Sequence, residues 1–223
     1  MRTVGIACRT IEDEINSVGK VLSDICPLIW IESGLHNYPS RLRDRLQEEI
    51  DKLTDVDNIV LIFGYCGNSV EGLLSTNAQL VIPKVDDCIS MLLGGNEVRL
   101  EVSRQRPSYY LTDGWLRYEY NIFQEYLHCQ EKYGSVRTQR IFGAMLEHYT
   151  TLNFIDTGTY SVEQLMAQTA ELATAANLQQ EVISGNLTLI AKALRGEWDE
   201  DFLKVPPGVP VHIGYSVHKE EDR

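Results

Sequence analysis

Short apolar runs, each followed at once by polar residues or glycine, recur through the first half of the chain. Each run is long enough for a buried strand and too short for a helix. The predicted strands are Thr3–Ala7, Leu28–Ile31, Ile59–Phe63 and Leu80–Ile82. Segments with apolar residues at helical spacing lie between the runs, most clearly from Ser40 to about Leu53. This alternation predicts an α/β fold with a mostly parallel sheet flanked by helices, the Rossmann-like or doubly wound arrangement.

The second half continues the alternation less regularly, and the 223 residues suffice for one large domain. We therefore predict a single α/β domain over residues 1–223, with a charged tail at 219–223. The elements predicted here are a short aromatic strand or extended turn over Ser108–Trp115, helices Trp115 to about Lys132 and Ser135–His148, a strand at Phe154–Ile155, a helix Val162–Ala176, an extended Glu181–Ile183, a helix Leu187–Leu194 and an extended segment near Phe202–Val205.

Charge and composition exclude some classes of partner. The formal net charge is −12 and the pI is near 4.8, which disfavours binding to nucleic acid or to anionic membrane surfaces. No apolar run reaches the roughly 18 residues of a membrane span, and the N-terminus lacks the pattern of a signal peptide. We expect a cytoplasmic protein, for which homodimerisation is the default expectation.

Soft metal ligands follow the predicted strands at the point where each strand ends. Cys8 follows the first strand, His36 lies in the loop after the second, and Cys66 and Cys88 lie beyond the third and fourth. The carboxyl ends of parallel strands meet at one edge of a sheet, where open α/β sheets bind ligands. Thiolates and imidazole are typical zinc ligands, so the sequence predicts a zinc site at this edge.

A plainer interpretation of these cysteines is also open, because free cysteine is among the most buried residue types and often only packs in a core. Cys26 and Cys129, which lie within or beside helical patterns, are interpreted in that way. Cys88 differs because it falls in the first turn of a predicted short helix. There the helix dipole is expected to favour its thiolate.

His36 and Asp87 are the predicted catalytic residues. His36 is expected to be either a ligand or an acid–base group, and Asp87 either orients its imidazole or simply caps the short helix, as Asp86 could also do.

The glycine-containing loop Gly64–Gly72 has the glycine content of a nucleotide-binding turn, but its spacing fits neither GxGxxG nor the P-loop. Gly64, Gly67 and Asn68 are nevertheless predicted to contact a cofactor. Asp156, at the end of a later strand, is predicted either to reach the same edge or to cap the next helix.

Seven segments together resemble the domain-of-unknown-function family numbered 1638. They are IACRTIEDEI, SGLHNYP, GYCGNSVEGL, LVIPKVDDCISMLLGG, SYYLTDGWL, NFIDTG and LRGEWDEDFLKVPPG, and they span nearly the whole chain. The family pattern includes the residues that are Cys8, His36, Cys66 and Cys88 here, with a small departure at GYCG. The resemblance implies a cytoplasmic protein that is often encoded beside corrinoid-dependent methyltransferases.

Three functions are compatible with these residues and with that resemblance. The first is a zinc protein of corrinoid-linked one-carbon metabolism, in which the metal activates a thiol or water for methyl transfer. The second is a non-catalytic accessory partner that carries metal or docks on a corrinoid protein or methyltransferase. The third, which uses the loop Gly64–Gly72, is an enzyme that binds a nucleotide or S-adenosylmethionine. In the first two cases zinc, a partner's corrinoid and a small-molecule methyl donor or acceptor are the expected cofactors and partners.

Overall fold

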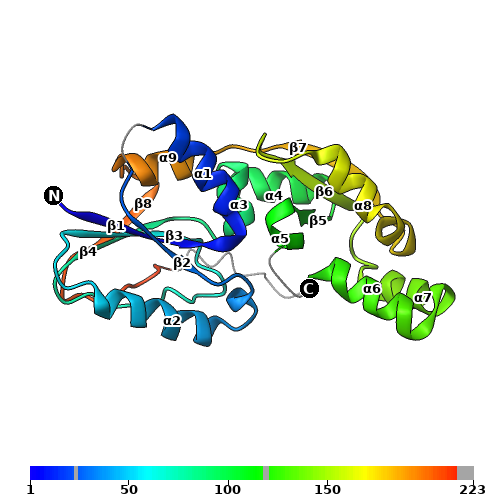
Figure 1. Cartoon of the computed structure of the whole chain (residues 1–223), viewed down its shortest axis with the longest axis horizontal. Coiled ribbons are helices and arrows are strands. Elements are labelled where there is room, and N and C mark those ends of the chain that lie inside the picture. Colours follow the sequence, from blue (N-terminus) through cyan, green and yellow to red (C-terminus); the bar gives the residue numbers. More distant parts are fainter. Residues whose placement is uncertain (23–24, 118–120, 215–223) are drawn as a thin grey trace.

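Two sheets flanked by helices form the protein, so the predicted α/β class is confirmed (Figure 1). The computed structural model describes residues 1–22, 25–117 and 121–214, and the predicted charged tail at 219–223 lies outside them. Sheet A has the order β2-β1-β3-β4-β8, and sheet B has the order β5-β6-β7. The strands of sheet A are β1 (Thr3–Cys8), β2 (Leu28–Ile31), β3 (Asn58–Ile62), β4 (Gln79–Pro83) and β8 (Phe202–Val205). Those of sheet B are β5 (Ser108–Leu111), β6 (Thr151–Asp156) and β7 (Gln179–Ser184).

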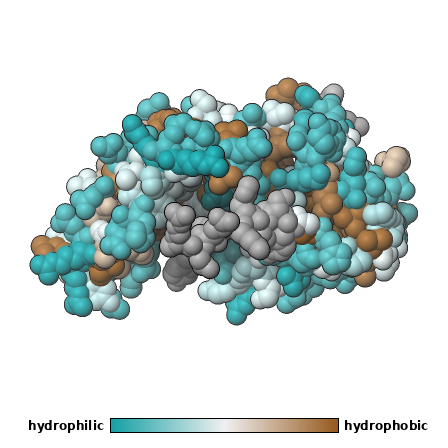
Figure 2. Space-filling view, turned by 180° about the vertical axis from the view of Figure 1, so that it is seen from behind, coloured by the Kyte–Doolittle hydropathy of each residue, from teal (hydrophilic) through white to brown (hydrophobic). Residues whose placement is uncertain are grey.

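The helices lie between these strands in chain order. They are η1 (Arg9–Ile11), α1 (Glu12–Val21), η2 (Leu35–Asn37), α2 (Pro39–Lys52), α3 (Cys88–Leu93), α4 (Asn96–Gln105), α5 (Asp113–Arg117), α6 (Ile122–Tyr133), α7 (Ser135–Met145), α8 (Val162–Ala175) and α9 (Thr188–Arg195). Within the described residues, no helix has both the length and the apolar character needed to cross a membrane. Hydrophilic residues cover most of the face shown in Figure 2, with apolar ones scattered among them.

The first four strands of sheet A run parallel, as the sequence predicted. β1 pairs with both β2 and β3, and β3 pairs with β4, all in parallel register. β8 joins the edge beside β4 in the antiparallel direction. The loops that follow β1, β2, β3 and β4 consequently leave the sheet along one edge.

Alternation along these strands divides the core of sheet A into two layers. Ile59 and Leu61 of β3 face the cluster under α2, whereas Val60 and Ile62 face the cluster under α1, α3 and α9. All five residues of β3 are buried, as expected for a central parallel strand covered on both faces. In Figure 1, α2 lies on one side of the sheet, and α1 and α9 lie on the other.

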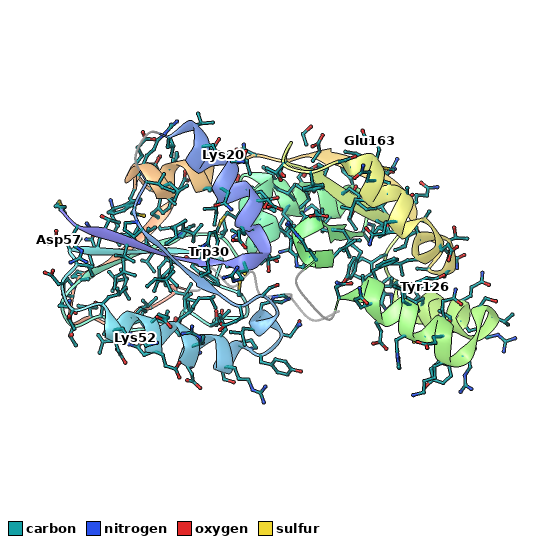
Figure 3. All side chains as sticks on the ribbon, viewed as in Figure 1. Lys20, Trp30, Lys52, Asp57, Tyr126 and Glu163 are labelled. Atoms are coloured by element: carbon teal, nitrogen blue, oxygen red, sulfur yellow. The ribbon has the colours of Figure 1, made fainter. Side chains whose placement is uncertain are left out.

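Sheet B has a buried cluster of its own on one face, built with α6, α7 and α8. Its buried cluster includes Phe154 of β6, Phe142 of α7 and Leu172 of α8. Tyr126, marked on α6 in Figure 3, packs edge-to-face against Phe142 with ring centroids 5.5 Å apart. The sequence predicted these strands but did not indicate that they pair apart from the first four.

The prediction of one helix from Trp115 to about Lys132 is wrong, because Asn121 separates two helices. Its side-chain oxygen accepts hydrogen bonds from the backbone nitrogens of Phe123 and Gln124, both at 3.0 Å, and so caps α6. Its amide group donates to the carbonyls of Trp115 and Leu116 in α5. One asparagine therefore holds both helix ends.

A buried carboxyl group lies where α1 meets the loop after β6. Glu14 is 2% exposed, and its Oε1 accepts hydrogen bonds from the hydroxyls of Thr157 at 3.0 Å and Thr159 at 3.3 Å. Burial raises the pKa of Glu14, and the two threonine bonds offset only part of this effect. The carboxyl thus links α1 to the loop after β6, and its ionisation would destabilise the folded protein.

Glu14→Gln is expected to make the protein more stable at pH 8 and to leave its stability at pH 4 nearly unchanged. A carboxyl with a raised folded pKa favours the folded state below the ordinary pKa of glutamate, and this contribution is lost as the pH rises through the folded value. Glutamine keeps an oxygen acceptor but never ionises. Urea unfolding at both pH values checks this, with Glu48→Gln on the exposed side of α2 as control; a loss of stability at pH 8 would contradict it.

Candidate functional site

The loops after β3 and β4 are joined backbone to backbone. The amide of Tyr65 donates to the carbonyl of Val85 at 2.8 Å, and the amide of Cys66 donates to the carbonyl of Asp86 at 2.7 Å. A Cβ on Gly64 would lie 2.5 Å from the backbone nitrogen of Asp87, so only glycine allows this approach. The pairing brings Cys66 beside Cys88, which is 22 positions away in the chain.

Cys66 begins a left-handed turn, and the loop then contacts α2 through the hydrogen bond from Arg43 to the carbonyl of Asn68. The φ angles of Cys66, Gly67 and Asn68 are 43°, 65° and 66°. Two of these residues are not glycine, and such a conformation is costly for residues that carry a Cβ. The amide of Ser69 donates to the carbonyl of Tyr65 at 2.9 Å and closes the turn.

Cys8 and His36 reach the same place from the other two loops. Cys8 ends β1, and its thiol donates to the Thr10 hydroxyl at 3.2 Å. His36 lies in η2, which begins after Gly34 in a left-handed conformation. A small cavity of about 20 Å³ is lined by Cys8, His36, Cys66 and Cys88 together. The predicted convergence at the edge of the sheet is therefore present, and the space enclosed is about that of one water molecule.

Burial controls the ionisation of these groups. It raises the pKa of the Cys66 thiol to about 12, with further contributions from Cys8 and Asp87. It also raises the pKa of Cys88 well above its ordinary value, and Cys66, Cys8 and Asp87 add to the effect. The prediction that the helix dipole favours the Cys88 thiolate is therefore wrong for the free thiol. Burial lowers the pKa of His36, and Asp87 opposes this only in part.

The residues fit zinc by chemistry but are not arranged for it as they stand. Within the part of the chain that is described, no group of three or more His, Cys, Asp or Glu side chains is placed so that it could hold a metal ion. The donor set of three sulfurs and one imidazole nitrogen is nevertheless that of common zinc sites. Ligation would require side-chain rotation, including release of Cys8 from Thr10. The zinc site thus stays a prediction.

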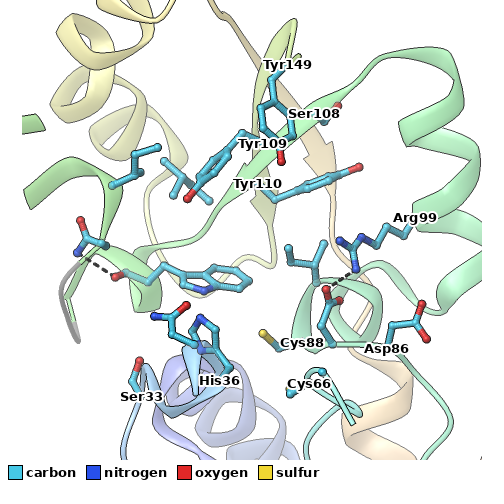
Figure 4. Close-up of a pocket in the computed structure, with 18 residues that line it drawn as sticks. Ser33, His36, Cys66, Asp86, Cys88, Arg99, Ser108, Tyr109, Tyr110 and Tyr149 are labelled. Atoms are coloured by element: carbon cyan, nitrogen blue, oxygen red, sulfur yellow. Dashed lines mark hydrogen bonds and ion pairs between the residues drawn. The ribbon is translucent and has the colours of Figure 1, made fainter. Parts of the chain in front are cut away.

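A larger cavity of about 540 Å³ opens beside the thiols, between the loops of sheet A and strand β5 of sheet B (Figure 4). His36, Cys66 and Cys88 lie on one side of it, and Tyr109, Tyr110 and Tyr149 lie on the opposite side. The remaining lining comes from Ser33, Asn37, Gly67, Asp86, Asp87, Ile89, Arg99, Ser108, Leu111, Trp115, Asn121 and Ile122. Cavities of this size hold small-molecule ligands.

Asp87 acts as a helix cap, which is one of its two predicted roles. Its Oδ1 accepts the backbone amide of Ser90 at 2.9 Å, and its Oδ2 pairs with the Arg99 guanidinium. Among the described residues, none forms a hydrogen bond with the His36 ring, so Asp87 influences that ring through its charge alone. Asp86 is held separately, since its Oδ1 accepts the side-chain amide of Asn96 at 3.0 Å.

The four predicted cofactor-binding residues have different positions. Gly64 lines the small cavity and Gly67 lines the large one. Asn68 lines neither, and its carbonyl accepts a hydrogen bond from Arg43 at 3.1 Å. Asp156 also lines neither, and its carboxylate accepts the amide of Gly158 at 3.0 Å in its own loop.

Sequence reasoning missed two charged or aromatic residues of the large cavity. Arg99 lies on α4, a helix that was not predicted. Tyr149 lies in the turn after α7, and no motif marked it. The neighbouring Tyr109, Tyr110 and Trp115 lie in the aromatic strand or extended turn that the sequence predicted, and this is the signal that pointed to this wall.

Comparison with known proteins identified one family. A family model described as "Protein of unknown function (DUF1638)" matches residues 30–194, close to three quarters of the chain. The matched region contains His36, Cys66 and Cys88, whereas Cys8 lies before it. No curated protein and no solved structure matches the chain.

Proposed function

The chain belongs to the DUF1638 family, and we propose that it binds zinc, with Cys8, His36, Cys66 and Cys88 as candidate ligands, and uses it on a ligand held in the large cavity. One observation carries this proposal: the same four side chains that the sequence singled out line one cavity of about 20 Å³. His36, Cys66 and Cys88 also line the neighbouring cavity of about 540 Å³. A metal site of this kind would be adjacent to substrate.

The protonated thiols support this proposal on energetic grounds. Burial raises the pKa of Cys66 and of Cys88, Cys8 adds to both shifts and Cys66 adds to that of Cys88, and no Lys or Arg side chain of the described residues contributes to either shift. A divalent cation is the usual means by which proteins stabilise several thiolates together. Binding would release protons from the thiols, so we expect affinity to rise with pH.

Bound zinc would lower the pKa of a thiol or water and so supply a nucleophile for methyl transfer, the chemistry of the corrinoid-dependent methyltransferases beside which members of the family are often encoded. The residues of this chain would hold the ligands in place. The paired loops fix Cys66 and Cys88, and Asp87 holds the first turn of α3 through Ser90. We propose three ligands and an open fourth position for the catalyst, and four ligands for the alternative, a non-catalytic accessory partner of a corrinoid-dependent methyltransferase.

Cys66→Ser is expected to reduce bound zinc from about one ion per chain to a small fraction of that, because one ligand of a small thiolate site is removed. The measurement is elemental analysis of protein purified without chelator. Cys129→Ser is the matched control, since Cys129 is a buried cysteine on α6 in the core of sheet B. Equal zinc in wild type and Cys66→Ser would refute the ligand assignment.

A demethylation assay then separates the two functions. With methyl-corrinoid and a thiol acceptor, the zinc-loaded wild type is expected to transfer methyl groups and Cys66→Ser is not. Bound zinc without turnover would favour the accessory role, in which the protein carries metal for, or docks on, a methyltransferase.

A further inference from the structure

Four aromatic side chains from three separate segments line the large cavity. Tyr109 and Tyr110 come from β5, Trp115 from α5 and Tyr149 from the turn after α7. The Tyr109 and Tyr149 rings stand at 86° to each other with centroids 5.6 Å apart, and Tyr110 directs its hydroxyl to Ser103 at 3.3 Å. Figure 4 shows the three tyrosines gathered on the side away from the thiols. The electron-rich faces of such rings attract cations.

The charges that line this cavity also favour a cation. Among its described lining residues, Asp86, Asp87 and Arg99 carry full charges. Arg99 forms an ion pair with Asp87, so these two compensate each other. The Asp86 carboxylate accepts one hydrogen bond from the neutral Asn96 amide, and among the described residues it forms no ion pair. One carboxylate charge therefore remains in excess in the lining of this cavity.

We propose that the large cavity binds an organic cation of the quaternary ammonium class, with its alkylated nitrogen against the tyrosines. A cation of this type has no N–H groups that need acceptors, so aromatic faces and one nearby carboxylate suit it better than they suit a primary ammonium. The volume of about 540 Å³ accommodates such a head group together with a short chain reaching toward the thiols. This inference goes beyond the proposed function, because it names a class of ligand for the large cavity and does not depend on bound zinc.

The test compares choline with 3,3-dimethylbutan-1-ol, which has the same shape with carbon in place of the charged nitrogen. Titration calorimetry on the full chain is expected to give at least about 10-fold tighter binding of choline, the scale of a desolvated cation–π contact. Tyr149→Leu should weaken choline binding about 5-fold or more, whereas Tyr149→Phe, which keeps a ring, should bind as wild type does. Asp86→Asn should weaken choline but not the neutral alcohol.

Tyr133→Leu is the matched control, because Tyr133 is an exposed tyrosine at the end of α6 that does not line the cavity. Equal affinity for choline and the alcohol, or choline binding that survives Tyr149→Leu unchanged, would overturn the proposal. Repeating the titration with Cys66→Ser separates it from the zinc assignment. Choline binding without bound zinc would support the cation site and refute only the zinc assignment. Bound zinc without choline binding would support the zinc assignment and refute the cation site.

Discussion

Gly64→Ala is expected to destabilise the protein by about 3 kcal/mol and to abolish metal binding, because the new methyl group would occupy the space of Asp87's backbone. The added Cβ would come within 2.5 Å of the Asp87 nitrogen and 2.6 Å of its carbonyl carbon. Backbone cannot rotate away as a side chain can. The two loops would have to separate, breaking the hydrogen bonds that place Cys66 beside Cys88. Urea unfolding and elemental analysis measure the two effects.

Gly143→Ala is a control of the opposite sign. Gly143 lies within α7, where an added Cβ would meet other atoms no closer than 3.8 Å. Alanine is the better helix former by about 1 kcal/mol, so this variant should be as stable as wild type or more so. If Gly64→Ala retained both wild-type stability and wild-type zinc, the joined loops could not be what organises the site.

The sheet that carries the candidate site was predictable because its signals are local. Runs such as Ile59–Phe63 are apolar on both faces, which indicates a central parallel strand. Parallel strands share one carboxyl edge, so the convergence of Cys8, His36, Cys66 and Cys88 followed from topology alone. The cap provided by Asp87 followed in the same way, from its position just before an apolar turn.

Features that depend on distant partners were not predictable from local patterns. An apolar strand pattern marks Phe154–Ile155 as a strand, but it does not say that β6 pairs with β5 and β7 rather than with sheet A. The break at Asn121 was missed because its side chain forms hydrogen bonds with both helix ends, which helical periodicity does not encode. Arg99 was missed because α4, the helix that carries it, has no buried residues and therefore no apolar pattern to predict it. Its ion pair with Asp87 depends on how α4 packs against the start of α3.

Ionisation was the least predictable property of the site. The position of Cys88 at a helix start favoured a thiolate, yet burial and two neighbouring thiols act in the opposite direction and dominate. A sequence gives the helix position of a cysteine but not the set of charges around it. The same limit applies to Asp156, whose carboxylate is engaged by Gly158 within its own loop.

The two sheets share one buried cluster, which bears on the prediction of a single domain. Tyr110 of β5 and Ile155 of β6 belong to the same cluster as Ile15 of α1 and Met91 of α3. Glu14 adds hydrogen bonds to Thr157 and Thr159 across the same junction. Because this contact is apolar and closely packed, we expect sheet B to unfold together with sheet A rather than before it.

Phe142→Ala is expected to cost about 3–5 kcal/mol and to shift one cooperative transition for the whole chain, since it deletes a fully buried ring from the core of sheet B. The ring packs on Tyr126 at 5.5 Å, and alanine would leave a cavity there. Urea unfolding followed by far-UV circular dichroism and by tryptophan fluorescence should give coincident curves, because Trp30, Trp115 and Trp198 all pack against the cluster that the two sheets share, whereas circular dichroism also reports the helices around Phe142. Leu127→Ala, at an exposed position on α6, should change stability little. Two separate transitions in Phe142→Ala, with fluorescence and circular dichroism diverging, would mean that sheet B folds independently and that the chain has two domains with the cavity between them.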